Sequence, residues 1–247
     1  MPEALPAKQS VFDRPGIAAD RALVESNLST SFQLASFRAA SSPHSGDWLF
    51  ALPISPCGLC LDDEAVRIAV SVRLGMAICV PHNCHCGSLV DAHGLHSFVC
   101  RKAPGKLTRH HALNDLVDRA FTSAGIPSSK EPHGLVRSDG KRPDGLTLVP
   151  WKGGKPLAWD VTAVCTVADS YVAATAREAG AAAERAAELK ISKYSGLDDK
   201  CVFQPIAVES LGPLNDTACQ FLKDLGRRIS AQSGDERECL LVLSFSD

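Results

Sequence analysis

The sequence predicts an α/β domain in its C-terminal half, preceded by a small segment rich in cysteine and histidine. Three observations favour this fold class. Helical and strand patterns alternate from Leu107 to Ser230, as they do in α/β proteins. The segment over residues 81–104 is too poor in large apolar residues to form a core by itself. The chain of 247 residues is 45% hydrophobic with a formal net charge of -2, which is typical of a globular protein with one good core.

Composition also bears on location and partners. No stretch approaches the roughly 20 apolar residues that a membrane span requires, and the opening MPEALPAKQS lacks the features of a signal peptide. We therefore expect a chain inside the cell, nuclear or cytoplasmic, with no membrane partner and no disulfides. Residues 101–160 carry 11 Lys/Arg against 6 Asp/Glu, a local balance of +5. This basic middle can face phosphate groups, and it is equally compatible with a solvated surface.

The composition divides the chain into four segments. Residues 1–45 mix Ala, Ser and Pro without sustained periodicity, so we expect a flexible N-terminal arm. Residues 46–80 form a helical linker segment, because three acids precede a helix from Ala65 to Leu74 that Gly75 ends. Residues 81–104 hold the cysteine and histidine cluster. Residues 105–247 form the α/β domain.

The elements of the α/β domain follow from its periodicity. The stretch from Leu107 to Ala124 is typical of a helix, which Gly125 and Pro127 end. The alanine-rich stretch from Ala173 to Tyr194 predicts a second helix, although Gly180 weakens its middle. The remaining elements are strands at Gly134 to Arg137, Pro143 to Val149, Pro156 to Val167 and Val202 to Val208, and a closing helix at Asn215 to Ser230. The predicted order is helix, three strands, helix, strand, helix.

Four metal-binding side chains lie within 17 residues. Cys84 and Cys86 have one residue between them, and His96 and Cys100 have three, which is about one helical turn. Gly87 permits a tight turn around an ion. We expect the four side chains to bind one structural Zn²⁺ in tetrahedral geometry, as a CCHC knuckle does.

Other cysteines and histidines compete for this role. Cys57 and Cys60 are an alternative ligand pair if Cys79 or His82 joins them. Two further candidate ligands within the segment are His85 and His93. The cysteines in apolar stretches are expected to be small buried hydrophobes: Cys165, Cys201, Cys219 and Cys239.

Two carboxylates fall on predicted strands. Asp144 follows Pro143 at the start of one strand, and Asp160 lies midway along the next. Adjacent antiparallel strands would bring both side chains to one end of a sheet, where paired carboxylates can hold Mg²⁺ or Mn²⁺. Thr162 faces the same way as Asp160, because residues i and i+2 share a face of a strand. On spacing alone, the pair is explained at least as well without a metal site, as one aspartate in a turn and one on an edge strand.

A lysine on the alanine-rich helix can complete this group. Lys190 shares a helix face with Lys193 and Tyr194, at i+3 and i+4. If the helix packs on the sheet, Lys190 reaches the same end of the sheet as the two carboxylates. Taken alone, a surface lysine on a helix is usually solvated.

The order of these motifs resembles that of a known family. It runs from Cys84-x-Cys86 and His96-x3-Cys100 through Arg109-His110, Arg142-Pro143-Asp144 and Trp159-Asp160-Val161-Thr162 to Lys190 and Lys193-Tyr194. From about Gly46 to its end, the chain is similar to the C-terminal region of site-specific LINE-type (non-LTR) retrotransposon proteins. In that family a CCHC zinc knuckle precedes a restriction-like endonuclease.

The resemblance implies a PD-(D/E)XK restriction-endonuclease-like core and an Mg²⁺- or Mn²⁺-dependent enzyme that nicks duplex or branched DNA. The RNA of the element is implied as a second partner. By the same resemblance, Asp144 and Asp160 are metal ligands and Lys190 is the catalytic lysine, displaced from the position of Thr162. Supporting or DNA-binding roles are implied for Arg109, His110, Arg142, Lys193 and Tyr194. The acid of the first helix is Asp115 or Glu131.

Two departures from the family favour other functions. Thr162 stands where the family motif has lysine, and the sequence contains no Tyr/Phe-x-Asp-Asp polymerase motif, so the chain corresponds only to the tail. A catalytically inactive nucleic-acid-binding module of the same fold is therefore the alternative. A zinc-stabilised protein-interaction domain unrelated to DNA is a third function, which requires the motif order to be a coincidence.

Overall fold

The computed structural model describes residues 9–50, 60–103, 105–137, 139–197 and 199–235. Its strands in the larger sheet are β3 (Ser128–Lys130), β4 (Gly145–Thr147), β5 (Leu157–Val164) and β6 (Val202–Glu209). They lie in that order, with β3, β4 and β5 antiparallel and β5 parallel to β6. The protein is therefore of the mixed α/β class that the sequence predicts, with a mixed sheet.

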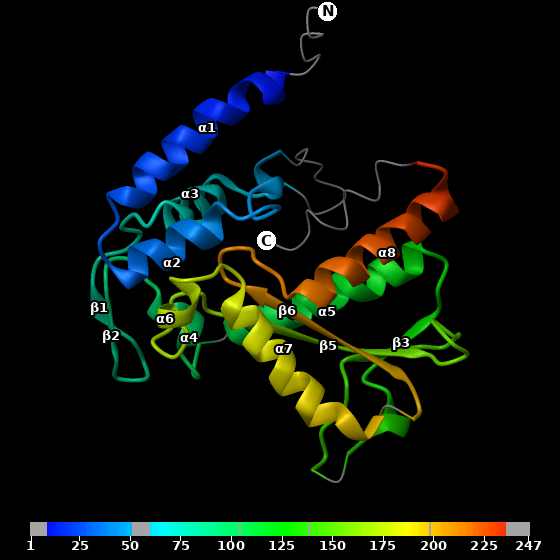
Figure 1. The fold of residues 1–247 in the computed structure, drawn as a ribbon. Coiled ribbons are helices and arrows are strands. Elements are labelled where there is room, and N and C mark those ends of the chain that lie inside the picture. The colour runs from blue at the N-terminus through cyan, green and yellow to red at the C-terminus, as the bar shows by residue number, and fades with distance from the viewer. Residues whose placement is uncertain (1–8, 51–59, 104, 138, 198, 236–247) are drawn as a thin grey trace, which may run out of the picture.

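Helices cover both faces of this sheet (Figure 1). Helices α5 (Gly105–Ser123) and α8 (Asp216–Ser233) lie side by side on one face, and α7 (Ala181–Tyr194) packs on the other. Successive side chains of a strand point to opposite faces. Trp159 of β5 accordingly points into the core beneath α5 and α8, whereas Asp160 points toward α7.

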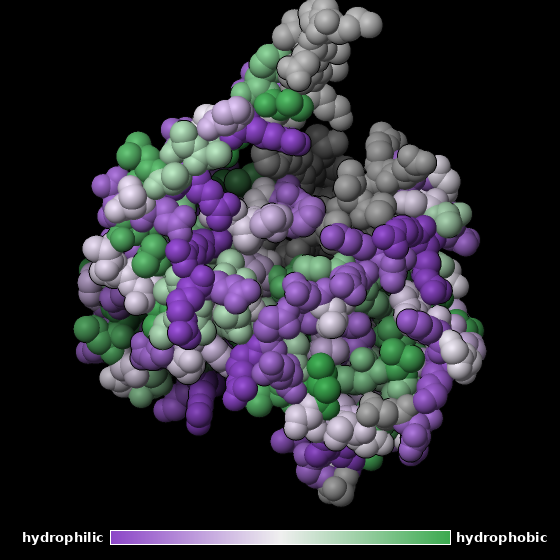
Figure 2. Space-filling model, in the orientation of Figure 1, coloured by the Kyte–Doolittle hydropathy of each residue, from purple (hydrophilic) through white to green (hydrophobic). Residues whose placement is uncertain are grey.

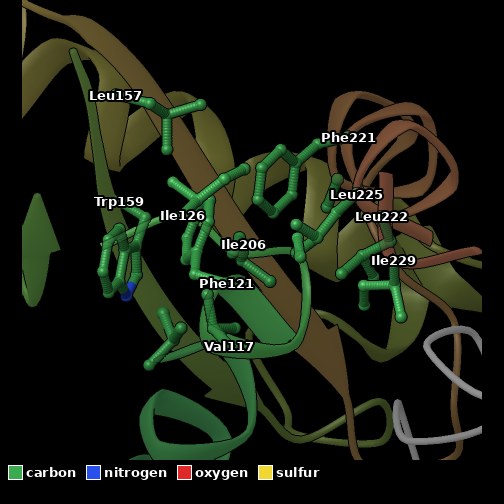
Figure 3. Packing of buried hydrophobic residues seen from close by; sticks show 13 residues of the cluster. Val117, Phe121, Ile126, Leu157, Trp159, Ile206, Phe221, Leu222, Leu225 and Ile229 are labelled. Carbon is green, nitrogen blue, oxygen red and sulfur yellow. The ribbon is translucent and has the colours of Figure 1, made fainter. Parts of the chain in front are cut away.

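The core between the sheet, α5 and α8 is built around aromatic rings. The ring of Phe121 lies 4.8 Å from that of Trp159 and 5.9 Å from that of Phe221, measured between centroids. Figure 3 shows Ile126 and Ile206 between Trp159 and the side chains of α8. Rings packed in tilted arrangements at these separations contribute beyond the burial of their area. This core fixes β5 firmly against α5.

Gly145 allows β4 to approach the core ring of Trp159, which it opposes in the β4–β5 register. A Cβ atom at residue 145 would lie 2.0 Å from Cζ2 of Trp159, and that ring is fully buried and has no free space to enter. Gly145→Ala should therefore lower the free energy of unfolding by about 1–3 kcal/mol, as overpacked cores do.

Denaturant unfolding of the variant checks this expectation. Gly134→Ala is the matched control, because a Cβ atom there meets nothing within 4 Å. Its unfolding midpoint should stay close to that of the wild type. Equal midpoints for the two variants would contradict the assigned clash.

Gly180 divides the alanine-rich segment into two helices. Its φ of +90° lies in the left-handed region, which glycine adopts without steric cost. The single helix predicted from Ala173 to Tyr194 is therefore wrong, since α6 (Val172–Thr175) and α7 are separate. Small side chains let α7 lie close to Ala207 of β6, and those that form a buried cluster with it are Ala183, Ala186 and Ala187. This close approach brings the polar end of α7 to the sheet.

The N-terminal segment contains regular structure that the sequence analysis missed. Within the predicted flexible arm of residues 1–45, the chain forms α1 (Gln9–Ser26) and α2 (Ser31–Ala40); residues 1–8 lie outside the described residues. A capping box begins α2, because the side chains of Thr30 and Gln33 each accept the other's backbone N–H. Arg38 donates two hydrogen bonds to backbone carbonyls just after α6. Helix α1 extends away from the remaining elements (Figure 1).

The helix predicted in the linker segment is confirmed. Helix α3 (Asp63–Arg73) is capped by Asp62, whose Oδ1 accepts the backbone N–H of Ala65 at 2.7 Å. Gly75 ends the turn with a φ of +65°. A short 3-10 helix, η1 (Asp47–Phe50), precedes it.

The first strand of the sheet differs from the prediction. The stretch from Gly134 to Arg137 is not a strand but contains the 3-10 turn η3 (His133–Leu135), and β3 lies earlier in the chain. The Ser-Ser-Lys sequence of β3 has no apolar alternation, so period 2 could not reveal it. Leu135 instead fills a core cluster with Tyr194. The order of helix, three strands, helix, strand and helix still holds, with the second helix divided at Gly180.

No helix in the described part of the chain is long and apolar enough to cross a membrane. Figure 2 shows hydrophilic residues over much of the visible face, with hydrophobic residues in small groups between them. The continuous hydrophobic clusters are those of the interior.

Candidate functional site

The predicted cysteine and histidine cluster assembles in the structure. A hairpin of β1 (His82–Asn83) and β2 (Leu89–Val90) carries Cys84 and Cys86 in its turn, and α4 (His96–Val99) carries the other two ligands at its ends. The four ligand atoms all lie within 4.8 Å of one another. The cluster could therefore hold a metal ion such as zinc.

The separations fit a tetrahedral site. The Sγ atoms of Cys84 and Cys100 are 3.8 Å apart, and Sγ of Cys86 is 3.1 Å from Nε2 of His96. Zn–S bonds of about 2.3 Å at tetrahedral angles place two sulfurs about 3.8 Å apart. Hydrogen bonds from Ser88 lower the pKa of the Cys86 thiol to about 6. The thiolate is the form that binds metal.

The competing ligands lie elsewhere. Cys57 is outside the described residues, and Cys60 and His85 are exposed and absent from the cluster. The remaining candidates face backbone carbonyls: Cys79 that of Asp91, His82 that of Val80 and His93 that of Met76. None of the eight cysteines that the structure describes forms a disulfide.

The two predicted carboxylates lie where β4 pairs with β5. Asp144 directly precedes β4, and its backbone N–H donates to the carbonyl of Trp159 at 2.9 Å. Its Oδ2 accepts the backbone N–H of Val161 at 2.6 Å, which fixes the carboxylate beside β5. Asp160 lies in β5 with a side chain only 3% exposed. The antiparallel register thus brings the two aspartates to neighbouring positions, as the sequence predicts.

Helix α7 supplies cations to Asp160. Lys190 donates to Oδ1 of Asp160, and Nζ of Lys193 lies 3.8 Å from Oδ2. Thr162, two residues along β5, carries no charge, so the ammonium next to Asp160 comes from the helix. Burial lowers the pKa of Lys193, and the charge of Asp160 opposes this shift.

Tyr194 connects α7 to the segment before β4. Its hydroxyl donates to the carbonyl of Arg142 at 2.7 Å and accepts a hydrogen bond of 2.6 Å from Lys193. Burial, followed by the hydrogen bond and charge of Asp160, raises the pKa of Tyr194. Arg142 contributes to the site through its backbone, since its guanidinium pairs with Glu131.

His110 of α5 faces Asp144. Its Nε2 lies 3.2 Å from Oδ1 of Asp144, and this contact, opposed by burial, raises the pKa of His110. Neither candidate for the acid of the first helix takes this position. Asp115 is exposed and pairs with Lys130, and Glu131 is exposed and pairs with Arg142. On this helix the side chain that faces Asp144 is therefore a histidine.

Asn114 is a positioning residue that the sequence analysis missed. It is buried in α5, where its Oδ1 accepts the indole N–H of Trp159 at 2.8 Å and its Nδ2 donates to the carbonyl of Asp144 at 3.4 Å. A polar residue in the apolar spacing of a helix is the signal that could have indicated it.

A surface pocket of about 400 Å³ adjoins the carboxylates. Its walls come from the segment after Cys100, from the start of α5, from β5 and from Lys190. Arg109 joins the two parts of the chain there, because its guanidinium contacts both the carbonyl and the ring of Phe98. The pocket therefore lies between the cysteine cluster and the sheet.

No protein-family model matches the chain, and the comparison with curated proteins finds no match to it either.

Proposed function

We propose that this chain is an Mg²⁺- or Mn²⁺-dependent DNA endonuclease with a PD-(D/E)XK-like core behind a CCHC zinc knuckle, related to the tail of site-specific LINE-type retrotransposon proteins. One observation carries the proposal: Lys190 of α7 contacts Asp160 beside Asp144. Through this contact, Lys190 supplies the ammonium group that the family motif places at the position of Thr162. The activity belongs inside the cell, in the nucleus or cytoplasm, with DNA as substrate and element RNA as a second partner.

The donor set fits a hard divalent cation. Asp144, just before β4, and Asp160, within β5, offer carboxylate oxygens at neighbouring positions, and a pocket lined by Val161 and Lys190 adjoins them. Mg²⁺ in proteins is commonly held by one or two carboxylates, with the other positions left to water and substrate phosphate. When bound, such an ion lowers the pKa of a water and polarises the phosphate that is attacked.

The residues of the chain have separable roles in this proposal. Lys190, 23% exposed, lies close enough to the carboxylates to stabilise negative charge on the phosphate. His110 holds Asp144 on one side, while the N–H of Val161 holds it on the other. Lys193 and Tyr194 keep α7 in place over the segment that leads into β4.

A second function has one observation in its favour. Each carboxylate already has a basic partner: Asp160 has Lys190 and Lys193, and Asp144 has His110, which is cationic when protonated. Such ion pairs can be purely structural in a nucleic-acid-binding module that has lost activity. Cleavage, and not binding, separates the two functions.

Lys190→Ala should lower the rate of plasmid nicking in Mg²⁺ by about a hundredfold or more, the scale on which one charge-stabilising group acts in an active site. DNA affinity should change little. Lys193 remains as a partner for Asp160, so the buried carboxylate is not left alone.

Thr162→Ala is the matched control, because it alters the position that the family motif gives to lysine. It should change the nicking rate far less than Lys190→Ala does. Single-turnover rates on supercoiled plasmid measure both variants. A larger loss for Thr162→Ala than for Lys190→Ala would exclude the assignment of the lysine to α7.

A further inference from the structure

The pocket beside the carboxylates is lined by positively charged side chains. Its basic lining residues are Arg101, Lys106, Arg109, His110 and Lys190, and no carboxylate of the described residues lines it. The rest of the lining is small or apolar, with Ala103, Thr162 and Ala163 leaving room above the sheet. The composition of its walls indicates an anionic ligand.

Three of these basic residues form no ion pair within the described parts of the chain; one of them, Arg109, contacts the carbonyl and the ring of Phe98. Lys190 and His110 face Asp160 and Asp144. Arg101 and Lys106 are both exposed, and neither forms an ion pair among the described residues. The first turn of α5 also lines the pocket, and the positive end of a helix dipole favours anions.

A second pocket on the protein shows that this charge is local. It has a volume of about 640 Å³ and lies along the start of α7, where Glu178, Glu184, Glu188 and Asp216 line it. The two pockets thus have opposite charge. A polyanion approaching the carboxylates should enter from the side of Arg101 and Lys106.

The cysteine cluster shapes one wall of the basic pocket. Arg101 directly follows the ligand Cys100, and the N–H of Ala103 donates to the carbonyl of Cys100 at 3.3 Å. Arg109 contacts the carbonyl of Phe98 in α4. An ion bound to the cluster would therefore fix the segment that carries Arg101.

We propose that this pocket binds a backbone phosphate of the DNA, on the strand next to the strand that is cut. The cysteine cluster positions the segment that holds this phosphate. The identity of the strand rests on the proposed function. Phosphate binding itself does not depend on cleavage, so it is measured without added Mg²⁺ or Mn²⁺.

The test uses the full chain and a fluorescein-labelled DNA duplex, with anisotropy read at several salt concentrations. Each neutralised phosphate contributes about 0.9 to the slope of log affinity against log salt. The double variant Arg101→Gln/Lys106→Gln should lower the slope by about 1, the loss of one phosphate contact, and weaken binding at low salt severalfold. Lys223→Gln, an exposed lysine of α8 that does not line the pocket, is the matched control and should keep the wild-type slope.

The metal content and the circular dichroism of the double variant verify that it is folded. A folded double variant with the wild-type slope overturns the proposal. A titration with inorganic phosphate at constant ionic strength separates the two sources of phosphate. Micromolar binding of free phosphate that the double variant loses, with no change in the DNA slope, assigns the pocket to a free anion and also overturns the proposal.

The outcomes for the two proposals are distinguishable. If the slope falls in the double variant but the wild type nicks no DNA in Mg²⁺ or Mn²⁺, the phosphate pocket stands and the endonuclease proposal fails. If the wild type nicks DNA and the slope is unchanged, the phosphate pocket fails and the endonuclease proposal stands.

Discussion

Asp144→Ala is expected to abolish nicking of supercoiled plasmid in Mg²⁺. The substitution leaves Asp160 as the single carboxylate, with Lys190 and Lys193 beside it, so the local charge no longer favours a divalent cation. Loss of one electrostatic group in an active site lowers the rate about 10²–10³-fold. Because this substitution removes the ion as well, the loss should be at least that large, with DNA binding retained.

Two further variants make this result interpretable. Asp144→Asn keeps an acceptor for the N–H of Val161, so it should fold like the wild type and also be inactive. Asp139→Ala removes an equal charge from an exposed turn, where Asp139 pairs with Arg137 and Lys141, and should nick at close to the wild-type rate. Nicking by Asp144→Ala at the wild-type rate would contradict the assigned role.

Removal of metal is expected to unfold residues 81–104. Among residues 81–103, which the structure describes, only Val90, Gly94 and Cys100 are buried, so apolar packing contributes little to the stability of this segment. A structural zinc in a small domain stabilises the folded form by an apparent 10–16 kcal/mol, roughly, at neutral pH. Protein purified without added metal should contain about one zinc per chain, and a strong chelator should open this segment to proteolysis while the sheet domain resists.

Elemental analysis and limited proteolysis with mass spectrometry measure both effects. Cys86→Ser should lower the zinc content, because its Sγ lies beside Nε2 of His96 in the cluster. Cys79→Ser is the control, since its thiol donates to a backbone carbonyl and is not part of the cluster. A preparation that is folded over residues 81–104 and free of metal would be inconsistent with a zinc site.

The parts of the site that follow from strand and helix periodicity could be predicted from the sequence. Asp144 directly precedes β4 and Asp160 lies in β5, its antiparallel neighbour, so their proximity needed only the correct order of elements. Lys190 and Lys193 are three residues apart on a helix, and both lie beside Asp160. The cysteine cluster could be predicted equally well, because its four ligands are close in the sequence.

The parts that depend on contacts between distant elements could not be predicted. The contact between His110 and Asp144 joins residues 34 positions apart, and nothing in the pattern of α5 distinguishes His110 from an exposed histidine. The contacts of Asn114 with Trp159 and Asp144 likewise join residues far apart in the sequence, although its polar side chain on the apolar face of α5 marks the position. The clash that makes glycine necessary at residue 145 exists only once Trp159 is packed.

Local signals explain the errors in the fold. The short β3 pairs with β4, and its polar side chains contact α5 without any apolar alternation, so its sequence carries no strand pattern. Helix α2 could have been found from the capping box of Thr30 and Gln33, which is a sequence motif. Gly180 divides α6 from α7 through its backbone conformation, whereas alanine content alone favours one continuous helix.

Conversion of supercoiled plasmid to the open circle by the wild-type chain, in Mg²⁺ and in Mn²⁺, is the decisive measurement for the endonuclease proposal. Nicking should depend on the divalent cation, stop with excess EDTA and be absent in Asp144→Asn. Duplex and branched substrates should be assayed together. A wild-type chain that binds DNA in a salt-dependent manner but nicks none of these substrates in either metal would contradict the endonuclease proposal and favour the nucleic-acid-binding module.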